Sequence, residues 1–144
     1  HTAPLSATSD LRFGLSWGVA QSASTEVAAL HGLSVNSLKL AALRHNIWHE
    51  GDSLGFSVAL PMALVSGGTT LSLPTGRDSS GAPTYTTVAV DFAPRQREVD
   101  LALTYRGALS TRTEGYFGVL HALNSGNIAG LTDTGLATGL RITF

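Results

Sequence analysis

The chain has 144 residues, a formal net charge of −1 and no cysteine. The near-neutral balance excludes a strongly basic surface for nucleic acid, and the absence of cysteine excludes disulfides and thiolate chemistry. Charged residues make up 13% of the chain, about half the share usual in soluble domains, yet no apolar run approaches the roughly eighteen residues of a membrane helix. Low charge without such a helix is typical of a transmembrane β-barrel, whose strands alternate apolar residues with small ones.

Strand-like alternation begins near the start of the chain. From Phe13 to Val19 every second residue is apolar, with small or polar residues between, and a period of two predicts a strand. We expect residues 1–10, which precede this strand, to form an extended tail or linker. We expect residues 1–144 to form one domain.

The clearest alternation runs from Leu54 to Leu64, where every second residue is apolar. Its length fits a tilted membrane strand of about 9–11 residues. The glycines of the segment 66–68 predict a tight hairpin turn after this strand. Residues 77–83 are polar and rich in turn formers, which predicts a loop.

His45 and His49 are the histidine pair nearest to a metal-ligand spacing. We expect both on one face of a strand, where residues four positions apart lie about 13 Å from each other, which is too far to share one ion directly. No serine lies in a glycine-flanked turn of the kind that presents a nucleophile to a histidine base. The sequence therefore predicts no metal, no cofactor and no enzymatic activity.

Charged residues occur at alternate positions of the later strands. An uncompensated charge in hydrocarbon costs several kcal/mol, so these side chains must face water or one another. The polar lumen of a barrel meets this condition, although a solvated face of a soluble sheet would meet it too. The candidate lumen residues are Asp91, Glu98, Asp100, Arg106 and Arg141.

Five aromatic residues lie near the ends of the expected strands. Amphipathic aromatic rings suit the headgroup layer at the boundary of a membrane, and ordinary packing in a soluble sandwich is the alternative. The candidate interface residues are Trp17, Trp48, Tyr85, Tyr105 and Tyr116.

The end of the chain has strong alternation and an aromatic terminus. Leu140, Ile142 and Phe144 share one parity, with Arg141 and Thr143 between them. Chain ends usually fray unless a sheet holds them, so we expect this segment to be the closing strand of a barrel. With it, the chain has about eight expected strands, in an all-β, antiparallel up-and-down arrangement.

Three segments carry a resemblance to a known family. Residues 51–62 read GDSLGFSVALPM, residues 71–77 read LSLPTGR, and residues 92–101 read FAPRQREVDL. From about residue 36 to its end, the chain resembles the C-terminal translocator domain of bacterial autotransporters that carry a subtilisin-like serine peptidase passenger.

The resemblance implies a domain of the bacterial outer membrane that anchors and exports its own passenger. Translocators of this family resemble twelve-stranded barrels with a linker helix in the lumen, and this chain corresponds to the later strands. It either closes by itself or takes strands from another chain. The implied partners are outer-membrane lipid, the passenger or linker helix, and the barrel-assembly machinery, which would read Leu140, Ile142 and Phe144 by strand addition.

Two other functions fit the same alternation. One is a structural or accessory outer-membrane barrel in a larger envelope complex, with no role in transport. The other is a soluble lipocalin-like or sandwich binding module, which would need a polar exterior.

Overall fold

The computed structural model describes residues 1–20, 24–25 and 28–144. This part of the chain is all-β, with ten strands in two antiparallel sheets and one short 3₁₀ turn, Ser125–Asn127. No helix among the described residues is long and apolar enough to cross a bilayer. The all-β, antiparallel prediction is therefore confirmed.

The chain divides into two compact units, where the sequence predicted one domain. The first contains His1–Ser16, Ser37–Pro61 and Arg95–Phe144, and the second contains Trp17–Asn36 and Met62–Pro94.

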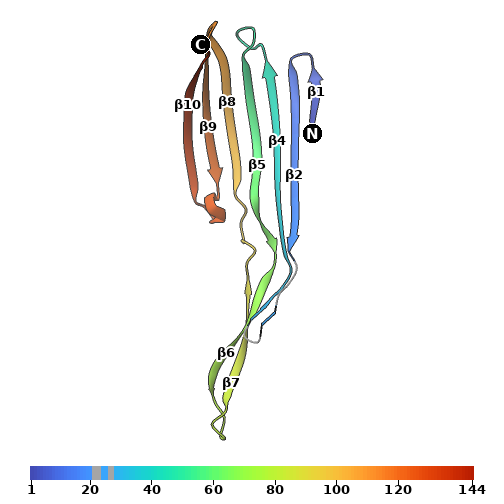
Figure 1. Ribbon diagram of the computed structural model, residues 1–144, viewed down its shortest axis with the longest axis vertical. Helices are drawn as coiled ribbons and strands as arrows, with labels where there is room; N and C mark the ends of the chain where they lie inside the picture. Colours follow the sequence, from blue (N-terminus) through green and yellow to red (C-terminus); the bar gives the residue numbers. More distant parts are fainter. Residues whose placement is uncertain (21–23, 26–27) are drawn as a thin grey trace. The chain divides into compact units, whose positions relative to one another are not determined.

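The larger sheet has seven strands in the order β1-β2-β4-β5-β8-β9-β10 (Figure 1). Their bounds are β1 Thr2–Ser6, β2 Ser9–Ala20, β4 Leu33–His45, β5 Ser53–Ser66, β8 Val99–Ser110, β9 Thr113–Leu123 and β10 Thr132–Ile142. Strands β1 and β10 are the two edges of this sheet. The sequence predicted a closed barrel of about eight strands, but within the described residues neither sheet closes.

The first residues form a strand, whereas the sequence predicted that residues 1–10 form a tail or linker. Strand β1 pairs antiparallel with β2, and Thr2 lies opposite Arg12. The backbone N–H of Phe13 donates to the carbonyl oxygen of His1 at 2.8 Å, and the terminal amine of His1 donates to the carbonyl oxygen of Phe13 at 2.8 Å. A turn of only two residues between the strands holds this segment against β2, so it does not extend away.

The smaller sheet has the order β3-β6-β7. Its strands are β3 Ala28–Leu30, β6 Gly68–Arg77 and β7 Pro83–Asp91. Strands β6 and β7 form a hairpin, and its loop is held by Asp78, whose carboxylate oxygen accepts hydrogen bonds from Ser80 and Ala82. These bonds, led by that of the Ser80 hydroxyl, lower the pKa of Asp78 against the opposing effect of burial. The polar loop predicted at residues 77–83 lies at this hairpin.

The hairpin predicted at residues 66–68 is wrong. Gly67 joins β5 to β6, and these two strands belong to different sheets. Gly67 has φ of +129°, a conformation that glycine adopts without the steric cost of a side chain. Strand β6 pairs with β7 and not with β5. Leu71 of β6 lies opposite Val88 of β7, so the apolar residues of these two strands face the same side.

A buried aspartate organises the turn between β4 and β5 at residues 46–52. The Asp52 side chain is 1% exposed and accepts hydrogen bonds from the backbone N–H groups of Ile47, Trp48 and His49 at 2.7, 3.0 and 3.0 Å. Burial acts to raise the pKa of Asp52, but these bonds and one from the Tyr105 hydroxyl outweigh it and hold the pKa below its ordinary value of 3.8.

The same turn ends β4 at His45. Asn46 has φ of +55°, which turns the chain out of the strand. Trp48 and His49 therefore lie in the turn, and the prediction that His45 and His49 share a strand is wrong.

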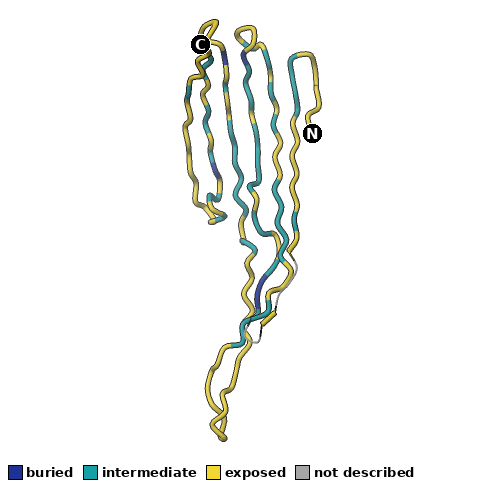
Figure 2. The backbone as a smooth tube through the Cα atoms, in the orientation of Figure 1, coloured by how far each residue is buried: buried dark blue, intermediate teal, exposed yellow. Residues whose placement is uncertain are grey.

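The strands carry almost no apolar core of their own. Among the described residues, Ala122 is the one buried apolar residue, at 5% exposure. Figure 2 shows the strands coloured mainly as exposed or intermediate along their lengths. Backbone pairing between strands, and not side-chain burial, is the main interaction that this sheet contains.

Replacing Asp52 with Asn should destabilise the β4–β5 turn, because a neutral amide oxygen accepts hydrogen bonds more weakly than a carboxylate. A depressed pKa contributes stability above the unfolded-state pKa of about 3.9, and this contribution is lost as pH falls through the folded pKa. Unfolding midpoints measured against pH should therefore separate the wild type from D52N at neutral pH and converge below about pH 4. Glu50→Gln removes a charge from the same turn and should leave the midpoint unchanged; an equal effect of both variants would contradict this assignment.

Candidate functional site

The register of the strands divides the seven-stranded sheet into two chemically different faces. Residues directly opposite in an antiparallel pair project to the same side. Leu54 lies opposite Tyr105, Tyr105 opposite Phe117, and Phe117 opposite Thr138, which aligns one face across four strands. On this side, which we call the apolar face, lie Leu54, Phe56, Val58, Leu101, Leu103, Tyr105, Phe117, Val119, Leu136, Leu140 and Ile142.

The opposite side, which we call the polar face, carries small and charged residues. Ser53 lies opposite Arg106, and Glu114 lies opposite Arg141. The members on these strands are Ser53, Gly55, Ser57, Asp100, Ala102, Thr104, Arg106, Glu114, Tyr116, Gly118, Asp133, Gly135, Ala137, Gly139 and Arg141. Leu120 and Ala122 are the apolar exceptions on β9.

The apolar face is solvent-exposed. Leu136 is 73% exposed, Phe56 50% and Leu103 46%. Apolar patches of this continuity on a protein mark contact with a membrane or with another protein. The sheet thus presents one surface suited to hydrocarbon and one suited to water.

The predicted lumen residues are only partly brought together. Asp100, Arg106 and Arg141 lie on the polar face. Glu98 precedes β8, where its carboxylate accepts a hydrogen bond from the backbone N–H of Gly126 at 2.6 Å and ties down the β9–β10 connection. Asp91 ends β7 in the second unit, and its carboxylate accepts the backbone N–H of Ala93 at 2.9 Å.

Two hollows lie on the polar face. One, of about 540 Å³, is lined by residues that include Lys39, Ala41, Leu43, Ala102 and Thr104. The other, of about 500 Å³, is lined by residues that include His45, Ser53, Arg106, Tyr116 and Ala137. The short side chains at Ser53 and Ala137 leave the second hollow open, and its charged rim suits water or a polar polypeptide segment.

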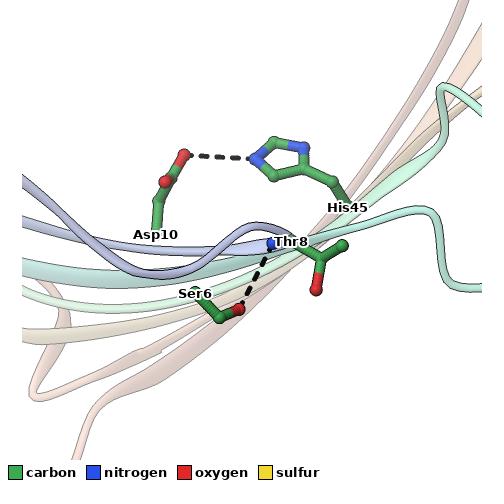
Figure 3. A network of polar contacts seen from close by, with 4 residues as sticks. All are labelled: Ser6, Thr8, Asp10 and His45. Atoms are coloured by element: carbon green, nitrogen blue, oxygen red, sulfur yellow. Dashed lines mark hydrogen bonds and ion pairs between the residues drawn. The ribbon is translucent and has the colours of Figure 1, made fainter.

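One interaction and one charged residue near the polar face were not predicted from the sequence. His45 Nε2 lies 3.1 Å from Asp10 Oδ2, which links β4 to β2 (Figure 3). No sequence signal joins residues so far apart. Glu114, opposite Arg141, was also missed, although it shares its parity with Tyr116 and the alternation of β9 could have revealed it.

The predicted interface aromatics occupy different surroundings. The rings of Trp48 and Tyr105 meet edge to face with centroids 5.1 Å apart, beside the β4–β5 turn. Trp17 and Tyr85 are 69% and 58% exposed, on β2 and β7. Tyr116 lies on the polar face, where its ring covers Gly139 of β10.

The three residues of the predicted assembly signal lie at the end of the chain. Leu140 and Ile142 are opposite Gly115 and Thr113 on the apolar face. Phe144 lies two residues beyond Ile142, the last residue of β10, and is fully exposed. The backbone N–H of Thr143 still donates to the carbonyl oxygen of Arg112 at 2.9 Å, so pairing with the preceding hairpin continues past the strand.

Comparison with known proteins identifies no relative: no family model, curated protein or solved structure matches this chain. Within the described residues, no group of three His, Asp or Glu side chains could hold a metal ion. The two faces and the exposed β10 strand are the surfaces of the described residues that bear on function.

The contact of Tyr116 with Gly139 predicts a preference for glycine at this position. A Cβ atom at Gly139 would overlap the far end of the exposed Tyr116 ring, which must turn aside to make room, so Gly139→Ala should cost about 0.5–1.5 kcal/mol, the usual cost of a side chain forced off its rotamer. At Gly135, on the same strand and face, the nearest contact of a Cβ atom would be Leu120 at 4.0 Å, so Gly135→Ala is the matched control and should be tolerated. Denaturant unfolding of both variants measures the difference, and Tyr116→Ala should remove the penalty at Gly139; a penalty that persists would place its origin elsewhere.

Proposed function

We propose that this chain forms part of the wall of a β-barrel in a bacterial outer membrane, where it anchors and exports a passenger segment. The chain performs no chemistry in this role. Its partners are outer-membrane lipid, the barrel-assembly machinery and the exported segment or a linker helix. The sequence resemblance to autotransporter translocators motivates the export role.

The exposed apolar face is the observation that carries the proposal. In a soluble sheet such a face packs against a second layer to form a core, but Leu103, Phe117 and Leu136 remain exposed. Lipid hydrocarbon would bury all three of these apolar side chains. Apolar residues toward lipid, alternating with polar and small residues toward a lumen, form the pattern of membrane barrels.

The lengths of the connections between strands indicate which end of the sheet would face the periplasm. Strands β1 and β2 are joined through residues 7–8, and β8 and β9 through residues 111–112, whereas β5 reaches β8 only through residues 67–98. Outer-membrane barrels have short turns on the periplasmic side and longer loops outside the cell. The short hairpins and the C-terminus share one end of the sheet in Figure 1, which supports a periplasmic location for that end.

The polar face supplies a route for a polypeptide. The polar face carries charged side chains that can form hydrogen bonds with a passing peptide backbone, at Arg106, Glu114 and Arg141. The small residues Gly118 and Ala137 leave room for the peptide beside the sheet. The seven strands of this sheet are completed by strands from outside it, because every backbone polar group in a bilayer needs a hydrogen-bond partner.

Lysine substitutions on the two faces test the proposal. Leu103→Lys places a charge on the apolar face, where it should cost about 2–4 kcal/mol at the bilayer centre. Ala102→Lys places the same charge on the adjacent residue of the polar face and should be tolerated. In cells carrying a reporter fused to the N-terminus, added protease should cleave the reporter of the wild type and A102K but not of L103K.

Insertion into lipid vesicles gives the second readout for these variants. We expect wild type and A102K to insert and to be protected from protease, and L103K to remain in the aqueous phase. If L103K inserted and displayed the reporter as well as A102K, the apolar face would not face lipid. If L103K were a folded protein with improved solubility in plain buffer, the soluble binding module would be favoured.

Deletion of Phe144 should impair assembly in cells more than folding in detergent. Phe144 makes no strand pair, so its loss removes little from the sheet, but it removes the aromatic residue that an assembly machinery would bind. The fraction inserted in cell membranes and the fraction refolded in detergent measure the two effects. An equal loss in both assays would show that Phe144 acts only through stability.

A further inference from the structure

The outer edge of β10 is a complete but unpaired strand edge. Ten of its eleven residues are exposed, Gly139 being the exception. Only β9 pairs with β10 in the described part of the chain. An open edge of this length presents a row of free N–H and C=O groups that pair readily with another strand.

The hydrogen-bond pattern identifies which residues face the open edge. The backbone N–H of Thr143 donates toward the β8–β9 hairpin, to the carbonyl oxygen of Arg112. Successive residues of a strand direct their backbone groups to alternate sides, so the even-numbered residues of β10 face outward. Consistent with this, the N–H of Thr134 donates to the carboxylate of Asp133 at 2.8 Å.

Strand β1 of the same chain is a poor match for this edge. Seven antiparallel strands in a row leave β1 and β10 running in the same direction (Figure 1), so closure would create a parallel seam in an antiparallel sheet. Strand β1 spans five residues and β10 spans eleven. Most of the outward groups of β10 would stay unpaired.

Two opposite charges stand near the two ends of β10. Asp133 and Arg141 both lie on the polar face, and neither has an ion-pair partner among the described residues. Glu114, opposite Arg141, has a buried carboxylate oxygen without a hydrogen-bond partner in this part of the chain. The strand is therefore acidic near its start and basic near its end.

We propose that the β10 edge binds β10 of a second copy of this chain, in an antiparallel pair centred on Ala137. In this register Thr132 lies opposite Ile142 of the partner subunit, so the whole strand is paired. The same register places Asp133 opposite Arg141 of the partner subunit. This single register therefore pairs β10 along its whole length and places the Asp133 and Arg141 charges of each copy opposite their counter-charges.

Geometry favours this register over its neighbours. The even-numbered residues pair with even-numbered residues, so all outward backbone groups form hydrogen bonds. Asp133 and Arg141 then occupy non-hydrogen-bonded positions, where opposing side chains are closest. A shift by two residues would pair Arg141 with Gly135 of the partner subunit. The apolar and polar faces each continue across the seam, because opposed residues share a side.

A single cysteine at the centre of the pair tests the contact in a chain that has no cysteine. In the variant Ala137→Cys the two Cα atoms should lie about 4.5 Å apart, within the range of about 4.4–6.8 Å that a disulfide needs. Gly135→Cys is the matched control, because the two copies of residue 135 would lie about 13 Å apart. We expect oxidation of the full chain in detergent to give a covalent dimer for A137C and not for G135C.

Charge reversal tests the register independently of the cysteine. Asp133→Arg places two like charges opposite each other, so it should reduce the A137C cross-link several-fold and shift the cysteine-free chain from dimer to monomer in sedimentation. Equal cross-linking of A137C and G135C, or a monomeric wild-type chain, would overturn the proposal. Cross-linking and sedimentation report only on pairing at the β10 edge. The dimer could therefore be absent while the chain inserts into membranes, or present while insertion fails, so the two proposals are tested separately.

Discussion

Backbone hydrogen bonding between neighbouring antiparallel strands is the interaction on which this structure depends. Strand β9 pairs along its length with β8 on one side and β10 on the other, and Ala122 is the one buried apolar residue of the described chain. A sheet held in this way can present apolar side chains outward, because its strands stay together without a shared core. The same dependence makes each unpaired edge costly wherever water is excluded.

The two faces follow from this arrangement and connect fold to function. A residue's neighbours across the sheet share its side, so Leu103 is aligned with Phe56 and Val119, while Arg106 is aligned with Ser53 and Tyr116. The apolar face would suit hydrocarbon, and the polar face would suit water. The β10 edge adds a third surface, whose charges and free backbone groups suit another strand. The export barrel that we propose would need all three: a lipid contact, a polar route and a closed circuit of strands.

Much of the sheet could be predicted from alternation, but its connections could not. The apolar run from Leu54 to Leu64 lies within β5, since a period of two is a local property. The glycine turn at Gly67 also has a local signal, yet that signal does not say whether the next strand returns to β5 or pairs with β7. The contact between His45 and Asp10 depends on which strands become neighbours, which no local pattern encodes.

Local alternation is enough to predict an all-β chain and the apolar parity of its clearest strands, such as residues 54–64, because side chains alternate along an extended backbone whatever surrounds it. The folded chain adds that the sheet is open, that residues 2–6 pair as an edge strand, and that Glu114 lies opposite Arg141. Register and strand order arise from hydrogen bonds between distant segments. A shift of one residue would exchange the two faces, so these long-range pairs determine which surface each residue occupies.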